Sequence, residues 1–480
     1  MLGLFNTLNL GSRALQANQV AVEVTGQNLA NANNPAYSRQ RVVLQTSLST
    51  PTNLGLEGTG VEAASIQQVR DQLLDSQIQS EAGVGGYWNS QQSALQTAQS
   101  QLNEFLNLNS TSGTAAGSSA ATGQSLSDQL NNLFNAFQSV ATSPTDLSAR
   151  QSLVNAAQSL ASGFNQASQN LATLNGQLNA SVTSGVASAN QLLSDIASLN
   201  GQIARATASG ATANDLVDSR EQDLEKLAQL VNIQTATNAD HTVSVSISGQ
   251  ELVSGGTLSD TLATYDPGNG QLLVAATPSS PSGGASTPLT LAGGSIQGTI
   301  DARDGAVATL RNSLGTLASS LITQVNGIYQ NGYDLNGSTG ANFFTGANAG
   351  DIAVNPALAN DPSQIQAAGV ANATGDNSVA LQLAQLGQQS VAGLNNETFS
   401  GAFALDVQNF GNALANANDQ VDSYNSVNTM LLNQRDSVSG VSLEEEASNL
   451  ITYQMAYSAS SKIITTVDQM LQTLMSMKST

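Results

Sequence analysis

The sequence predicts a mainly α-helical fold with a β insertion: coiled-coil-like terminal helices, an elongated helical-bundle body and a small inserted β domain. Three observations lead to this class. Apolar residues recur at helical spacing over most of the chain, and the period changes to strand-like alternation at about residue 233. Both ends carry stripes with alternating steps of three and four. At 480 residues, the chain exceeds one comfortable core, so several domains are expected.

The N-terminal stripe combines large apolar residues with small or polar ones. Its large apolar members are Leu4, Leu8, Leu15, Val22 and Leu29. Its other members are Gly11, Asn18 and Thr25. This spacing keeps the stripe on one side of a helix that needs a partner helix. We therefore expect a subunit interface, and we expect the helix to be loose in the free subunit, because so few large side chains offset the ordering cost poorly.

The first helix is expected to end before residue 35. Pro35 cannot continue a helix and disfavours helical backbone at Asn34. Residues 41–46 then predict a short strand, and the Pro and Gly residues between 51 and 60 predict loops up to about residue 65.

Residues 66–231 predict several helical segments of an antiparallel bundle. The glycines at 83, 85 and 86 are expected to interrupt the pattern, as is the Ser, Gly, Ala and Thr run at 110–125. Ser143 followed by Pro144 predicts a helix start with Ser143 as the cap.

A small β domain is predicted at 233–298. Residues 243–247 alternate between apolar and polar side chains, which indicates a half-buried strand. Residues 266–270, DPGNG, predict the turn of a hairpin. Residues 278–295 are expected to form a loop, and the helical pattern returns at about residue 301.

The last body helix is expected from near Phe403 to Val438, with a break at Ser439 and Gly440. Ser442 and Glu445 then predict a capping box that starts the C-terminal helix. The interface stripe of that helix consists of Leu450, Tyr453, Tyr457, Ile464, Val467, Leu471 and Leu474.

These elements predict a nested chain. The terminal helical domain consists of 1–34 plus 441–480, and the body consists of 35–232 plus 299–440. The β domain at 233–298 is inserted into that body. Both ends of each layer must come together in space, which favours one long subunit.

Composition excludes several kinds of partner. The net charge is −21, with 13 Lys and Arg against 34 Asp and Glu, so nucleic acid is a poor partner. No apolar stretch is long enough to predict membrane insertion. The chain has no cysteine and no secretory signal pattern at its start. Composition does not decide where the protein is located. A cytosolic acidic protein and a protein exported without a cleaved signal are equal alternatives.

No catalytic constellation is predicted, so we expect no enzyme, no cofactor and no metal site. The single histidine, His241, is expected at a surface or strand edge. Asp334 begins a segment that resembles a calcium loop, but the required downstream Glu is missing, so a turn is expected. The acidic residues at 221, 223 and 225 are interpreted as a solvated helix face.

Two segments carry a family resemblance. Residues 28–40, NLANANNPAYSRQ, resemble the signature of the rod, hook and hook-associated axial proteins of the bacterial flagellum. Residues 439–447, SGVSLEEEA, narrow the resemblance to the hook-associated protein 1 family. The motif residues are Asn31, Asn33, Pro35, Tyr37, Ser38, Arg39 and Gln40. Ala36 stands where the family usually has Gly.

The resemblance implies a structural protein of the hook–filament junction. Such a protein is exported through the flagellar type III system and is located in the extracellular flagellum. Its implied partners are copies of itself in a helical assembly, the hook protein and the next hook-associated protein on the filament side. A cytoplasmic export chaperone is implied on the C-terminal helix.

Two other functions remain as alternatives. Another axial protein, of the hook or rod, shares the N-terminal motif but should lack the capped start at 442–445. A secreted adhesin would use the β insertion at 233–298 as its binding surface. An enzyme in the insertion is a remote third possibility because no acid or base group supports it.

Overall fold

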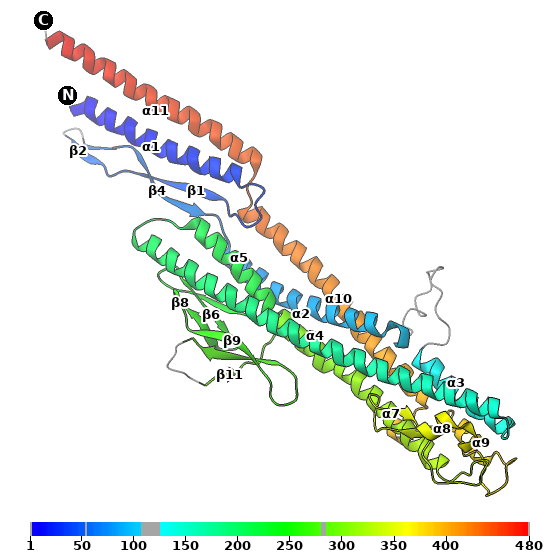
Figure 1. The fold of residues 1–480 in the computed structure, drawn as a ribbon. Helices are drawn as coiled ribbons and strands as arrows, with labels where there is room; N and C mark the ends of the chain where they lie inside the picture. The colour runs from blue at the N-terminus through cyan, green and yellow to red at the C-terminus, as the bar shows by residue number, and fades with distance from the viewer. Residues whose placement is uncertain (1, 53–54, 107–124, 280–284, 479–480) are drawn as a thin grey trace.

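The computed structural model describes residues 2–52, 55–106, 125–279 and 285–478. The molecule is elongated, with both termini at one end and the loops around α8 and α9 at the other (Figure 1). Most described residues are helical, which confirms the predicted mainly α fold. The predicted interruption at 110–125 lies, apart from Ser125, outside the described residues.

The two terminal helices pack on each other in antiparallel directions (Figure 1). They are α1, Leu2–Ala30, and α11, Leu443–Lys478. A Cβ atom added at Gly11 would lie 2.9 Å from Cγ1 of Ile464, so the two predicted stripes meet within one chain. The structure therefore pairs the helices that the sequence argument expected to be loose in the single subunit.

A β ribbon covers another side of α1. Strand β1, Gln40–Thr46, pairs antiparallel with β4, Val61–Gln68, and a short pair, β2 at Thr50–Thr52 with β3 at Gly55–Glu57, lies between them. The predicted loops to residue 65 were wrong, because the positive φ angles of Gly55 and Gly60 make turns within the ribbon. We call α1, α11 and this ribbon the terminal unit, although the predicted division assigned residues 35 onward to the body.

Helices form the body, as predicted. They are α2 Gln72–Leu106, α3 Leu126–Thr142, α4 Leu147–Ala208, α5 Asn214–Leu230, α6 Gly294–Ala302, α7 Ala308–Tyr329, α9 Ser378–Leu386 and α10 Phe399–Ser439. The helical pattern therefore returns at Gly294 instead of at residue 301. A π-helical turn, Arg303–Val307, joins α6 to α7.

The predicted break at the glycines of 83–86 was wrong, because α2 runs through them. A Cβ atom at Gly85 would lie 2.1 Å from the Tyr424 ring of α10. One at Gly86 would lie 2.0 Å from the backbone oxygen of Gln229 on α5. These glycines let neighbouring helices approach the backbone of α2.

Helix α4 is one continuous helix of 62 residues, where the sequence predicted separate segments. The predicted cap at Ser143 was also wrong. Asp146 caps the helix instead, because its Oδ1 accepts a hydrogen bond of 2.8 Å from the backbone N–H of Ser148.

The inserted strands form two small sheets beside α4 (Figure 1). The four-stranded sheet contains β5 Gln234–Thr237, β6 Val243–Ile247, β7 Gln250–Ser254 and β8 Thr257–Leu258. The three-stranded sheet contains β9 Asp260–Tyr265, β10 Leu273–Pro278 and β11 Thr287–Pro288. The predicted strand at 243–247 and the predicted hairpin around 266–270 are confirmed.

Short elements occupy the far end of the body. They are β12 Phe344–Thr345, β13 Ala353–Val354, α8 Pro356–Asn360 and the 3-10 turns Pro362–Gln364 and Ala392–Leu394.

The body contains two large apolar cores. One is built from the end of α2, α3, the first half of α4, α7, α9, α10 and the far-end loops, and it contains the packed rings of Phe137, Tyr329, Phe343 and Phe344. The other is built from the second half of α4, α5, α6 and the inserted strands. The β insertion therefore shares its core with the helices.

Candidate functional site: the joint between the terminal unit and the body

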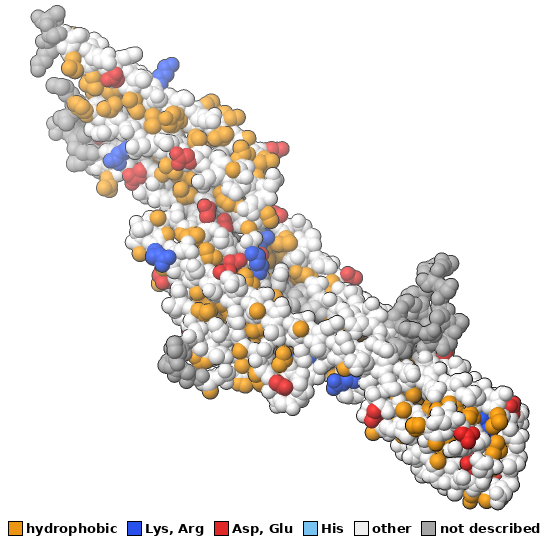
Figure 2. All heavy atoms as spheres, viewed as in Figure 1, with side chains coloured by type: hydrophobic (Ala, Val, Ile, Leu, Met, Phe, Trp, Pro, Cys, Tyr) orange, Lys and Arg blue, Asp and Glu red, His pale blue; other side chains and the backbone are white. Residues whose placement is uncertain are grey.

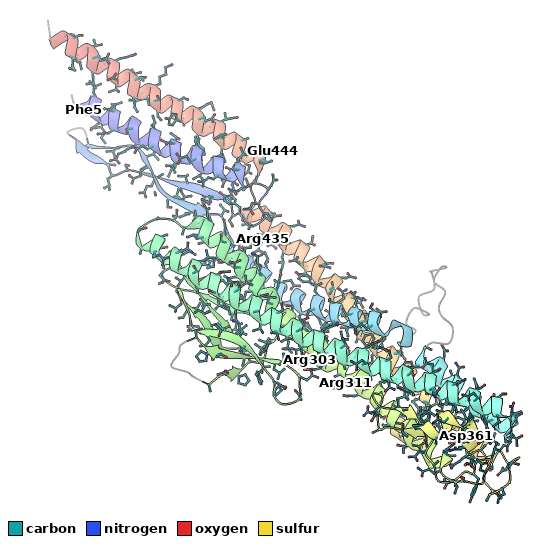
Figure 3. All side chains as sticks on the ribbon, viewed as in Figure 1. Phe5, Arg303, Arg311, Asp361, Arg435 and Glu444 are labelled. Carbon is teal, nitrogen blue, oxygen red and sulfur yellow. The ribbon has the colours of Figure 1, made fainter. Side chains whose placement is uncertain are left out.

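The terminal unit meets the body at a joint around the crossing from α10 into α11. We define the joint as residues 31–40, which leave α1, residues 435–446, which lead into α11, and the facing residues 215–225 of α5. A solvent-open cavity of about 700 Å³ lies among these segments and also contacts Arg70. Figure 3 places Arg435 and Glu444 on opposite sides of the crossing into α11.

Asn28, near the end of α1, organises the inner side of the joint. Its side chain is 1% exposed. Its Oδ1 accepts hydrogen bonds from the Tyr37 hydroxyl, at 2.8 Å, and from the backbone N–H of Gln40, at 3.0 Å. Its Nδ2 donates to the Gln40 backbone oxygen, at 2.8 Å, and to Oε2 of Glu446, at 3.1 Å. One amide therefore ties α1, the motif and α11 together.

Arg39 links the motif to the first turn of α11. Its Nε donates to Oε1 of Glu446 at 2.8 Å, and its NH1 group lies 2.8 Å from Oε2 of Glu445. Its backbone N–H donates to the Ser439 oxygen at 2.9 Å. The Glu446 side chain is 3% exposed and that of Glu445 is 62% exposed, so the inner pair is the better protected from solvent.

Ser38 and Gln40 connect the motif to α5. The backbone N–H of Ser38 donates to Oδ2 of Asp218 at 3.1 Å, and Nε2 of Gln40 donates to Oδ1 of Asp215 at 3.1 Å. Arg70 holds the other Asp218 oxygen at 3.1 Å. Burial raises the pKa of Asp218 in spite of these partners.

Tyr37 lies among the same groups. Burial raises its pKa to about 12, and the nearby carboxylates of Asp215, Asp218 and Glu446 add to that effect. The hydroxyl is therefore held in its protonated, donating form, which the bond to Asn28 requires.

The structure brings together only part of the predicted motif. Tyr37, Ser38, Arg39 and Gln40 meet at the joint, as described above. The Asn31 side chain instead donates to the Gln27 oxygen within the end of α1, at 3.0 Å. Asn33 and Pro35 are exposed on the cavity rim.

Ala36 fits the turn without left-handed backbone, since it is not among the residues with positive φ. Its N–H donates to Oδ1 of Asn34 at 3.1 Å, and the N–H of Tyr37 donates to the Asn34 oxygen at 3.1 Å. An asparagine turn therefore makes the bend at this position.

One half of the predicted capping box is present. The N–H of Glu445 lies 3.4 Å from Oγ of Ser442. The Glu445 carboxylate pairs with Arg39 instead of returning to the Ser442 amide, because the guanidinium offers a charged donor.

The interpretation of the α5 carboxylates as a solvated face was wrong for two of them. Glu225 pairs with Arg435 of α10 at 2.7 Å, and Glu221 pairs with Arg220 at 3.1 Å. Burial raises the pKa of Glu225. These side chains face the crossing from α10 to α11, whereas Asp223 pairs with the exposed Lys226 at 3.1 Å.

Sequence reasoning missed the partners that hold the motif. Asn28 and Glu446 lie within the two segments that carried the resemblance, so both could have been included. Asp215, Asp218 and Arg70 lie far from the motif in sequence, and no local pattern marks them.

The predicted stripe residues face partly inward. Most are half-buried, Val467 is 3% exposed, and Leu29, Tyr457 and Leu474 are exposed. Their role between subunits remains a prediction. A different face of α11 is exposed to solvent. We call its large apolar residues the outward stripe: Ile451, Met455, Ile463 and Met470. Figure 2 shows hydrophobic side chains spread over the surface of this helix pair.

Other chemistry is sparse in the described part of the chain. It contains no group of three or more His, Cys, Asp or Glu side chains placed to hold a metal ion. Asp334 forms the expected turn, because its Oδ1 accepts from the N–H groups of Asn336 and Ser338. His241 is exposed. Among the helices that the structure describes, none is both long and apolar enough to cross a membrane.

Two family models match the chain. The "Flagellar hook-associated protein FlgK helical domain" matches residues 118–344, and the "Flagellar basal body rod FlgEFG protein C-terminal" matches residues 433–477. The second match covers the end of α10 and almost all of α11.

The chain is also similar to relatives over almost their full length. The chain is 28% identical to flagellar hook-associated protein 1 of Bacillus subtilis strain 168, with 98% of each chain covered. It is 24% identical to the protein of that name from Escherichia coli K12, over 98% of this chain and 99% of the relative. The solved flagellar hook junction protein FlgK of Burkholderia pseudomallei has a similar fold. Its TM-score is 0.63 at 19% identity, over 76% of this chain and 100% of that one.

The paired terminal helices, the joint and these matches define the class of the protein, which is a structural axial protein of the bacterial flagellum. Within that class, the matches support hook-associated protein 1. This result favours the predicted family over the hook and rod alternatives.

Proposed function

We propose that this protein joins the flagellar hook to the filament and does so without catalysis. Its neighbours in the flagellum are copies of itself, the hook protein on one side and the next hook-associated protein on the other. The full-length similarity to hook-associated protein 1 supports this role. The division of the chain into the predicted terminal, body and inserted domains is part of the proposal.

The observation that carries the proposal is the terminal unit with its bare outward stripe. Helix α11 has 36 residues and packs mainly on α1. Large apolar side chains stay exposed on its other face. A second copy is the occupant that we propose, because a surface repeated on identical subunits generates a helical assembly. The predicted stripe residues then shape each helix pair, and the outward stripe contacts the neighbour.

The joint has a matching role in this proposal. It fixes the direction of the terminal unit through the network of Asn28, Arg39 and Glu446. Subunits with one fixed direction can repeat the same neighbour contact around a ring or helix.

Export completes the proposal. The subunit would leave the cell through the flagellar type III system and act outside the cell. A cytoplasmic chaperone would cover α11 before export, because the exposed apolar residues of that helix invite association.

Gene deletion and electron microscopy test the function. Cells without the gene should carry hooks that lack filaments, and the intact gene should restore them. The variant Ile451→Asp/Ile463→Asp should fail to restore filaments, since it places charges on the outward stripe. A matched variant, Gln454→Asp/Gln472→Asp, changes exposed polar residues of the same helix that lie about 60° outside the arc of the outward stripe, and it should restore them. Filaments attached to hooks in the deletion strain would contradict the proposal.

A further inference from the structure

The methionines of this chain are exposed, and most lie on α11. All five methionines that the structure describes have more than half of their surface exposed: Met430 59%, Met455 62%, Met470 52%, Met475 74% and Met477 71%. The sequence contains six methionines and no cysteine. Thioethers are therefore its only sulfur groups.

Met455 and Met470 share one face of α11. They are 15 residues apart, which places them within about 60° of each other around a helix with about 100° per residue. Ile451 and Ile463 lie in the same region, and together the four span an arc of about 120°. Met475 lies about 140° around the helix from Met470. Two of the four outward-stripe residues are therefore oxidisable.

We infer that Met455 and Met470 are modification sites where a peroxide weakens the contact between neighbouring subunits. The inference rests on the proposed function, since the outward stripe matters only when a second copy covers it. In the reaction, the thioether sulfur attacks one oxygen of hydrogen peroxide and gives up two electrons. The O–O bond breaks and a sulfoxide forms. The second oxygen leaves as water with both peroxide protons.

The change in polarity explains the effect. A thioether is a flexible apolar group that adapts to an irregular neighbour surface. A sulfoxide is polar and must lose water when a second copy covers it, and an apolar neighbour offers no hydrogen bond in return. Two such groups within one face should lower association at least about tenfold, because one 1.4 kcal/mol difference already gives that factor.

Exposure also predicts when the sites react. In the free subunit, both methionines are more than half exposed, so they should oxidise readily. In the assembled flagellum, the neighbour should shield Met455 and Met470. Met430 lies on α10 in the body and should react equally in both states, which makes it an internal control.

The first measurement is peptide mass spectrometry after graded hydrogen peroxide. Purified free subunits and isolated flagella would be compared at equal peroxide doses. We expect sulfoxide at Met455 and Met470 to form at least about five times more slowly in flagella, with Met430 unchanged. Equal rates at Met455 and Met470 in both samples would overturn the inference.

The second measurement uses sulfoxide mimics in cells that lack the native gene. Met455→Gln/Met470→Gln should lose filament attachment, whereas Met455→Leu/Met470→Leu and Met430→Gln/Met475→Gln should keep it. Normal attachment with the first variant would overturn the inference. Failure of the proposed function is distinct, since the deletion strain would then keep its filaments or Ile451→Asp/Ile463→Asp would restore them.

Discussion

The body and the terminal unit are both helical, but different forces hold them together. The body encloses two cores with many large side chains under 2% exposed, including Phe137, Phe164 and Phe343. The buried apolar residues of the terminal helices are fewer and mostly smaller: Ala17, Ala21, Val24 and Val467. Charged and amide groups at the joint supply the connection between the two regions. The comparison teaches that large buried side chains hold the body together, whereas the terminal unit buries few of them and keeps large apolar side chains of α11 exposed.

Removal of a core ring should show the strongest contrast between the regions. Phe343→Ala removes contacts with Phe137, Tyr329 and Phe344, whose ring centroids lie 4.9–5.2 Å away. The expected loss is ~3–5 kcal/mol in the free energy of unfolding, measured by chemical denaturation. Ile451→Ala on the outward stripe should change the same quantity by less than ~0.5 kcal/mol in the free subunit. A large loss for the second variant would show that α11 is already covered.

A pair of glycines tests the close packing inside the body. Gly86→Ala should lower the free energy of unfolding by ~1–3 kcal/mol, because its Cβ atom would overlap the Gln229 backbone. Gly176→Ala is the control. It lies within α4 with no atom within 4 Å of the added Cβ, so it should raise stability by ~0.5–1 kcal/mol. An equal increase in the free energy of unfolding for Gly86→Ala and Gly176→Ala would contradict the packing of α2 on α5.

The two glutamates on Arg39 test the joint. Glu446→Gln should reduce protection of the backbone at residues 31–40 against hydrogen exchange by ~1 kcal/mol, because it removes the shielded charge partner. Glu445→Gln alters the exposed partner, so its effect should be much smaller. Protection of the α7 core should stay unchanged in both variants. Equal effects of the two variants would contradict the predominance of the buried pair.

Among these tests, alkaline titration of Tyr37 should have the smallest effect on the stability of the joint. Tyr37 keeps its proton to about pH 12 in the folded protein, compared with about pH 10 when unfolded. Its stabilisation is complete below pH 10 and is lost as the pH rises towards 12. Joint protection should therefore decline over that range, and Tyr37→Phe should reduce the decline. Absorbance at 295 nm should show one fewer late-ionising tyrosine in the variant.

Local patterns predicted the elements but not their partners. Helical spacing located α7 and α10, and strict alternation located β6. The prediction of a helix break at 83–86 failed because glycine has two uses. It weakens an isolated helix, but it also lets a neighbouring helix pack closely. Only the neighbours Tyr424 and Gln229 show that these glycines serve close packing. The predicted helix start at Ser143 was wrong because a second residue that can cap a helix, Asp146, lies three positions later.

The joint shows the same limit. The resemblance found Tyr37 to Gln40 because these residues are adjacent in sequence. It could not find Asp218, which lies 180 residues from Ser38, because the α5 position depends on the whole body fold. The stripe pattern located the terminal helices, yet it could not show that α11 has a second apolar face, since both faces contain residues at heptad intervals.

Helix α4 gives the body a mechanical property. Its 62 residues correspond to a length of about 90 Å, and it supplies Leu153–Leu178 to one core and Val182–Ala197 to the other. One continuous helix therefore contributes side chains to both cores. Torque applied at one end of the body would be transmitted along the hydrogen-bonded backbone of α4. Deformation would then be concentrated at the joint.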